Sequence, residues 1–186
     1  MKLNQFGRAF MLALAVWIGS MGGVLAHALP DSTLIFAEDE DQISLTIQLA
    51  LEDLTIAEPT LVDLMEHPVA QDIPAADVAV VARYFAQHLQ IQNDDGAFSP
   101  TLAGVAIETA HNDHVGRYAL LTLQYQFPAS TSPLYLTYDA IMHEVRNQRA
   151  AVYWQESGSE PRIIEEFGYR PVDGMQQPIQ LNFLSR

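Results

Sequence analysis

Histidine is the residue type whose chemistry points most directly to a function in this sequence. His27 stands out because it follows Ala26, at the end of a stretch with the pattern of a cleavable export signal. If cleavage leaves His27 at the N-terminus, its free amine and its imidazole can bind one metal ion together. The amine titrates at about pH 8 and gives up its proton to Cu(II) or Ni(II), the ions that such nitrogen ligands suit.

One further imidazole would complete a set of three nitrogen ligands, and the chain offers several. His111 and His114 fall in an expected hairpin loop, where exposed histidines are also ordinary surface residues. His143 follows Met142 in an expected strand, where it would equally suit a hydrogen-bonded core position. The spacing alone does not choose among His111, His114 and His143 as partners of His27. It is also compatible with none of them binding metal.

Motifs for other common chemistries do not occur in the sequence. There is no glycine-rich phosphate loop, no G-x-S-x-G elbow, no H-E-x-x-H helix and no EF-hand loop. The carboxylate clusters Asp39-Glu40-Asp41 and Glu165-Glu166 are typical of solvated turns and strand edges. Since no nucleophile can be paired with a base, we expect a protein that is not an enzyme.

The N-terminal segment predicts export. Lys2 and Arg8 precede an uncharged stretch that ends in Val24-Leu25-Ala26, the small-residue pattern that signal peptidases recognise. We therefore expect a signal peptide at 1–26 and one periplasmic or otherwise extracytoplasmic domain at 27–186. Two alternatives remain: an uncleaved anchor, since about 18 uncharged residues can just span a bilayer, and cleavage after Ala28, which would remove His27.

Composition narrows the range of partners. The formal charge is −14, and the expected signal peptide contributes basic residues only, so the remaining domain is more acidic still. Nucleic acid is not an expected partner, because phosphate binding needs a basic face. The chain has no cysteine, which excludes disulfides and thiolate metal ligands. No second apolar stretch is long enough to cross a membrane, so we expect the cleaved protein to be soluble.

Hydrophobic periodicity predicts a β-rich domain. Apolar and polar residues alternate over 43–49, which with the apolar run at 32–36 indicates a hairpin. Helical spacing over 74–88, with Pro74 in the first turn, predicts the main helix. Many short strands favour a mainly β fold, with β-sandwich-like antiparallel sheets and one packed α-helix at about 74–88. Further strands are expected at 102–109, 118–127, 134–141, 150–154 and 163–167.

Several segments, in order, carry a family resemblance. They are A-H-A-L-P-D-S at 26–32, L-A-L-E-D-L at 49–54, Y-F-A-Q-H-L at 84–89, T-A-H-N-D at 109–113 and Y-D-A-I-M-H-E-V at 138–145. Together they resemble the extracytoplasmic N-terminal region of the HupE/UreJ-type hydrogenase/urease accessory family. Ala50 replaces a usual proline, and Gln148 stands where that family often has a second histidine.

The resemblance implies an outer domain without the membrane domain that family members usually carry. That family is linked to nickel or cobalt uptake largely through the membrane half. We therefore expect a non-enzymatic accessory domain that binds or helps handle nickel, copper or cobalt, and that works with a separate membrane transporter or envelope protein. The alternative is an envelope protein-interaction module with no metal site.

The resemblance also orders the candidate ligands. His143 becomes the first choice to join His27, because it lies in the segment most like the family. His111 is the second, since a hairpin loop can reach a neighbouring chain terminus. His88 ranks last, because it closes the expected helix and would serve there simply as a polar end.

Overall fold

The computed structural model describes residues 30–39, 41–66, 73–145 and 147–183. The predicted signal peptide and His27 lie outside these residues. The helices are α2 (Leu51–Ala57), the 3-10 helix η1 (Pro59–Glu66) and α3 (Ala75–His88). The strands are β1 (Ser32–Asp39), β2 (Gln42–Ala50), β3 (Leu89–Asn93), β4 (Gly96–Ala97), β5 (Thr101–Asn112), β6 (Gly116–Pro128), β7 (Leu134–Tyr138), β8 (Arg149–Gln155), β9 (Arg162–Gly168), β10 (Pro171–Val172), β11 (Met175–Gln176) and β12 (Ile179–Leu181).

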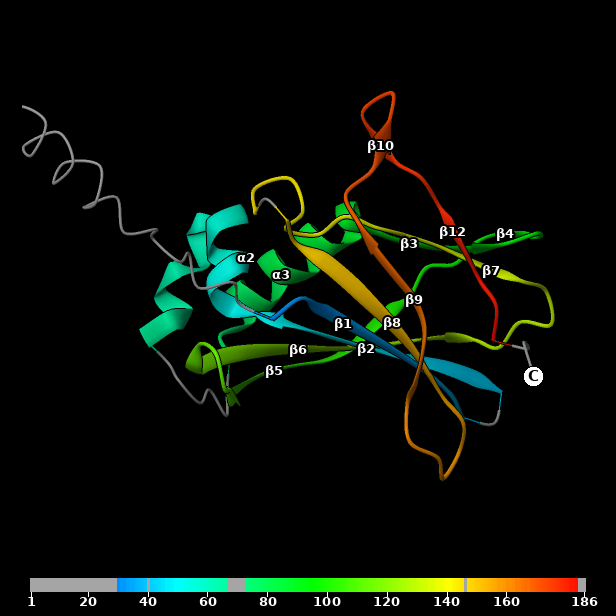
Figure 1. Cartoon of the computed structure of the whole chain (residues 1–186), viewed down its shortest axis with the longest axis horizontal. Helices are drawn as coiled ribbons and strands as arrows, with labels where there is room; N and C mark the ends of the chain where they lie inside the picture. The colour runs from blue at the N-terminus through cyan, green and yellow to red at the C-terminus, as the bar shows by residue number, and fades with distance from the viewer. Residues whose placement is uncertain (1–29, 40, 67–72, 146, 184–186) are drawn as a thin grey trace, which may run out of the picture.

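The larger sheet has six strands in the order β5-β6-β2-β1-β8-β9. The hairpin expected at the start of the chain is β1 with β2, and the longest one is β5 with β6. Every pairing is antiparallel except that of β1 with β8, which is parallel. The sheet is therefore mixed, and its N-terminal strand lies in the interior of the strand order (Figure 1).

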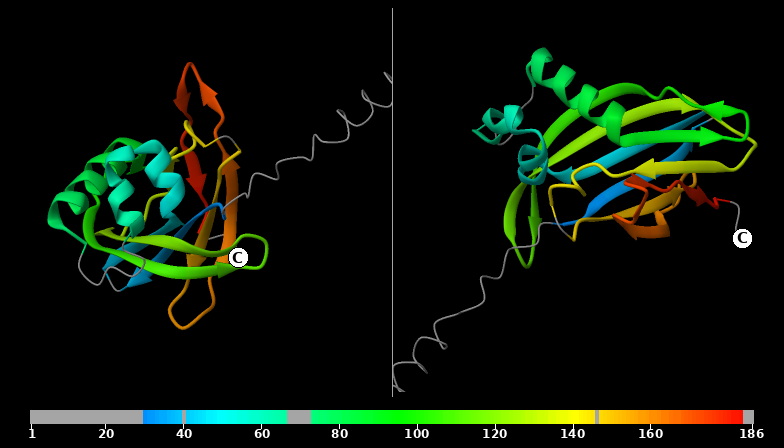
Figure 2. Two further views of the ribbon diagram at one scale, coloured as in Figure 1. Left: turned by 90° about the vertical axis from the view of Figure 1, so that its left-hand side faces the viewer. Right: turned by 90° about the horizontal axis from the view of Figure 1, so that it is seen from above.

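The smaller sheet has four strands in the order β12-β7-β3-β4, and β10 with β11 forms a separate projecting hairpin (Figures 1 and 2). The sequence did not indicate β3, because five residues directly after a helix leave no room for a separate periodic signal. At the far end of β3, the side-chain oxygen of Asn93 accepts hydrogen bonds from the backbone N–H groups of Asp95 and Gly96, which closes the turn between β3 and β4.

A single core joins the two sheets and the helices. Alternate residues of β2, β6, β7 and β8 are buried, as expected for strands with one face against a core. Phe36 of β1 is fully buried and meets Phe127 of β6 edge to face. Across the layers, the Tyr138 hydroxyl at the end of β7 bonds the Ser32 hydroxyl at the start of β1 over 3.0 Å. The predicted mainly β, sandwich-like fold is confirmed.

The helices lie toward one end of the sheets (Figures 1 and 2). The predicted helix at 74–88 is confirmed as α3, which buries Val81, Tyr84 and Phe85. Residues 51–57 form α2, because Leu51 and Leu54 pack one turn apart into the core.

Helix α2 also buries a charged side chain. Asp53 is 5% exposed, and its Oδ2 atom has no hydrogen-bond partner within the described residues. Burial raises the pKa of Asp53 to about 6, and the neighbouring carboxylates Glu52 and Asp31 add to the effect. A buried carboxylate with one oxygen left unpaired costs stability when it is ionised.

The segment after β7 departs from the sequence prediction. The strand expected at 134–141 ends at Tyr138, and residues 140–144 form a turn. Ile141 has φ +59°, the left-handed region, so the chain cannot continue as a strand through this residue. His143, which was expected in a strand, therefore lies in this turn.

Candidate metal centre

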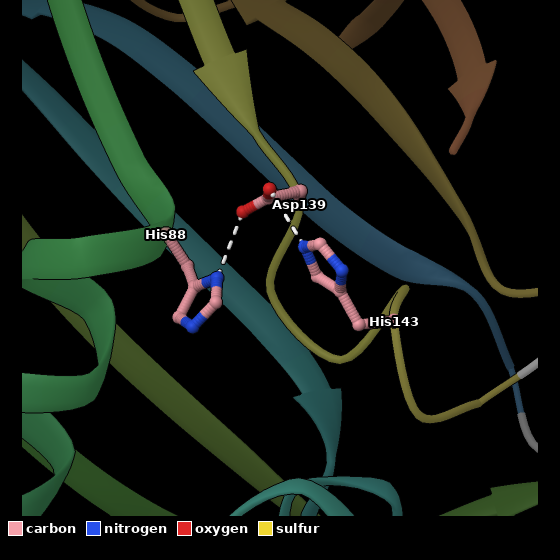
Figure 3. Close-up of side chains that lie close together, drawn as sticks. All are labelled: His88, Asp139 and His143. Carbon is pink, nitrogen blue, oxygen red and sulfur yellow. Dashed lines mark hydrogen bonds and ion pairs between the residues drawn. The ribbon is translucent and has the colours of Figure 1, made fainter. Parts of the chain in front are cut away.

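Three elements bring His88, Asp139 and His143 together (Figure 3). His88 is the last residue of α3, and Asp139 directly follows β7. Their backbones are joined as well, because the Asp139 N–H donates to the His88 carbonyl over 3.2 Å. His143 comes from the turn that follows. Within the described ranges, this is the one group of three or more His, Asp or Glu residues whose ligand atoms lie within 4.8 Å of one another.

The Asp139 carboxylate lies between the two imidazoles. His88 Nδ1 lies 2.8 Å from one carboxylate oxygen, and His143 Nε2 lies 2.9 Å from the other. A carboxylate accepts hydrogen bonds and does not donate them, so each of these ring nitrogens carries a proton in this arrangement. The remaining ring nitrogens, His88 Nε2 and His143 Nδ1, point away from each other (Figure 3).

The electrostatics keep Asp139 ionised. Burial alone would raise the pKa of Asp139, but the hydrogen bonds from His88 and His143 outweigh burial and hold it below its ordinary value of 3.8. The side chains of His88 and Asp139 are about four-fifths covered, whereas that of His143 is 35% exposed. The group is thus a charged, partly sheltered cluster with one side open to solvent.

Two tyrosines support the imidazoles. Tyr84 lies one helical turn before His88, and their ring centroids are 4.4 Å apart at a tilt of 32°. Tyr169 contacts the other imidazole, with ring centroids 4.4 Å apart. Burial raises the pKa of Tyr84 to about 12, so its hydroxyl stays protonated at neutral pH. Ring contacts of this kind restrict how each imidazole can turn.

A strained turn connects Asp139 to His143. Ile141 is fully buried and has φ +59°, a rare conformation for a β-branched residue. Its N–H donates to the Tyr84 hydroxyl over 2.8 Å, and its carbonyl accepts from the Val145 N–H over 2.9 Å. These bonds hold a conformation that would otherwise be costly, and strain of this kind gathers at functional sites.

The cluster suits a divalent transition metal. With bonds of about 2.1 Å at right angles, two ligand atoms lie about 3.0 Å apart. The observed N–O separations of 2.8 and 2.9 Å match this spacing as well as that of ordinary hydrogen bonds. Two imidazoles with one carboxylate suit divalent first-row transition metals, among them cobalt, nickel, copper and zinc, and leave further positions for water or another ligand. Mg(II) and Ca(II) prefer sites made of oxygen alone.

Of the three ligands predicted from the sequence, His27, His143 and His111, only His143 lies in the cluster that the structure describes. His111 is instead exposed at the end of the β5–β6 hairpin, where its ring lies 3.6 Å from Asp113. His114 lies in the turn of that hairpin. The proposed role of His27 stays a prediction, because this residue lies outside the described part of the chain.

Sequence reasoning ranked His88 last and did not consider Asp139 as a ligand. The four-residue interval from Asp139 to His143 was a signal, but it places both side chains together only if the chain turns between them. A strand through Ile141 would have kept them apart, and the left-handed conformation at an isoleucine has no signature in the sequence.

The chain matches no protein-family model and no curated protein. None of the helices in residues 30–183 that the structure describes is long and apolar enough to cross a membrane.

Proposed function

We propose that this protein is a non-enzymatic, extracytoplasmic domain that binds a divalent transition metal, nickel, copper or cobalt, through His88, Asp139 and His143. The observation that carries the proposal is the ionised Asp139 carboxylate held between two imidazole nitrogens. The order of residues near the N-terminus supports the location. The resemblance to the HupE/UreJ-type family agrees with a role in metal handling beside a separate membrane transporter.

The site favours exchange over permanent storage. Three protein ligands leave coordination positions free, and His143 is partly exposed, so an incoming ligand can reach the metal. A structural site would normally close its coordination shell with protein atoms. These properties suit a carrier that receives a metal ion and passes it on, with His27 as a further ligand if the mature chain begins there.

Calorimetric titration of the mature protein tests the proposal. Cu(II) and Ni(II) should bind at one site per chain, with Cu(II) the tighter in line with the general order of affinities. Mg(II) and Ca(II) should give no measurable heat at the same concentrations. His111→Ala is the matched control, since it removes an exposed histidine outside the cluster. If neither Cu(II) nor Ni(II) binds, the metal function is wrong.

Nitrogen NMR of the histidine rings tests which atoms bind. In the metal-free protein, His88 should carry its proton on Nδ1 and His143 on Nε2, because these nitrogens face Asp139. Binding of diamagnetic Zn(II) within the cluster must replace those protons, so both rings should switch to the other tautomer. Unchanged tautomers in the zinc-bound protein would mean that the outward nitrogens bind, which contradicts the proposed geometry.

A second function, docking to an envelope protein, is favoured by the surface of η1. In a 3-10 helix residues three apart share a face. Leu61 and Leu64 face the core, Val62 and Met65 form an exposed apolar ridge, and Asp63 and Glu66 are exposed on the third face. An apolar ridge beside an acidic one suits a partner segment with apolar and basic residues. This function takes over if no metal binds.

A further inference from the structure

Tyr84 touches both histidine arms of the cluster. It precedes His88 by one turn of α3, and its ring packs against the His88 imidazole. Its hydroxyl accepts the N–H of Ile141, in the turn that leads to His143. The residue itself is 7% exposed, so both contacts form in the protein interior.

The hydroxyl contact supports the strained residue of that turn. A left-handed isoleucine is unfavourable unless the surroundings impose it. Its buried N–H also needs a partner, since an unpaired buried donor is costly. The Tyr84 hydroxyl supplies that partner at 2.8 Å. Without it, the turn would gain by changing conformation, and His143, two residues further on, would move away from Asp139.

We propose that Tyr84 is the positioning residue of the cluster: its hydroxyl fixes the turn that carries His143, and its ring fixes the orientation of His88. This inference rests on the proposed metal-binding function, because positioning matters for affinity only if the cluster binds metal. Tyr84 itself donates no ligand atom. It preorganises two ligands that come from different elements, so less order has to be gained when the ion binds.

The test variant is Tyr84→Phe, which keeps the ring and removes only the hydroxyl. We expect its affinity for Ni(II), measured by calorimetry, to fall about 10-fold, the low end of the range for residues that support metal ligands. The matched control is Tyr125→Phe. Tyr125 is also buried, at 6% exposed, but it lies on β6 and has no hydrogen bond to the cluster. Its variant should bind Ni(II) like the wild type.

A second measurement on the metal-free protein separates this inference from the proposed function. In the wild type, the Ile141 amide should exchange slowly with solvent, and the His143 Nε2 proton should give a distinct signal because it is held by Asp139. In Tyr84→Phe, exchange at Ile141 should speed up and the His143 signal should broaden. Tyr84→Phe and Tyr125→Phe should unfold at comparable temperatures. A general loss of stability would then not explain weaker Ni(II) binding in Tyr84→Phe.

The outcomes are distinct. Weaker Ni(II) binding in Tyr84→Phe alone, with faster Ile141 exchange, supports the positioning role. Wild-type affinity or unchanged Ile141 exchange in Tyr84→Phe overturns it, even if the cluster binds metal. If the wild-type protein binds no metal, the proposed function fails, and the metal-free measurements still decide whether Tyr84 holds the turn.

Discussion

Replacing Asp139 with asparagine is expected to weaken Ni(II) and Cu(II) binding by on the order of 100-fold or more, beyond the usual effect of losing a residue that only supports a ligand. The substitution keeps the size and shape of the side chain but removes its charge. An amide oxygen is a poorer ligand, and an amide N–H₂ group directed at either imidazole competes for the nitrogen that must bind the metal.

Calorimetry of the Asp139→Asn variant measures this effect directly. Thermal unfolding followed by circular dichroism should be recorded alongside, because Asp139 also accepts two hydrogen bonds in the metal-free protein. Substitution of the exposed His111 by alanine should leave the affinity unchanged. If Asp139→Asn binds either metal within about threefold of the wild type, a difference under about 1 kcal/mol, the carboxylate is not a ligand.

Replacing Asp53 with asparagine is expected to stabilise the protein at pH 8 by about 2–3 kcal/mol, because the pKa of this buried carboxyl is raised from 3.8 to about 6. For a carboxyl with a raised folded-state pKa, the folded protein keeps its proton while the unfolded chain loses it. Stability therefore falls as pH rises from about 3.8 to about 6, and the penalty then stays constant.

Urea unfolding of wild type and Asp53→Asn between pH 4 and pH 8 tests this prediction. The difference in unfolding free energy should be small near pH 4 and reach its full value above about pH 7. Asp63→Asn is the matched control, since it removes one negative charge from an exposed position on η1. A stability difference for Asp53→Asn that does not change with pH would mean that the carboxyl ionises without penalty in the folded protein.

The fold was largely predictable because most of its strands bury one face. Alternation of apolar and polar residues over 43–49 predicted β2, and helical spacing of apolar residues predicted α3. In both elements the fold buries the apolar residues of the sequence pattern, wholly or in part. The short strands β10, β11 and β12 were not predicted, since two or three residues cannot show a period. The parallel partner of β1 could not be inferred either, because the partner strands are far apart in the sequence.

The site was predictable only in part. His143 was identified through the resemblance of its segment to a known family, but its partners depend on the conformation of a single residue. In its left-handed conformation, Ile141 donates its N–H to the hydroxyl of Tyr84, 57 positions earlier. A contact of this range leaves no local pattern. His88 was expected only to close the helix. The same position at the end of α3 directs its ring at Asp139, the residue that follows β7.

The position of β1 sets an order for folding. During synthesis the N-terminal strand β1 leaves the ribosome long before its parallel neighbour β8. The separation is large: Asp31, just ahead of β1, accepts a hydrogen bond from the backbone N–H of Arg149, 118 residues further on. Until β8 emerges, one edge of β1 stays open, and β8 and β9 cannot join the sheet. Pairing over such a separation is slow. The topology therefore delays completion of the sheet until nearly the whole chain has been synthesised. In that interval an unpaired strand edge is exposed to other chains.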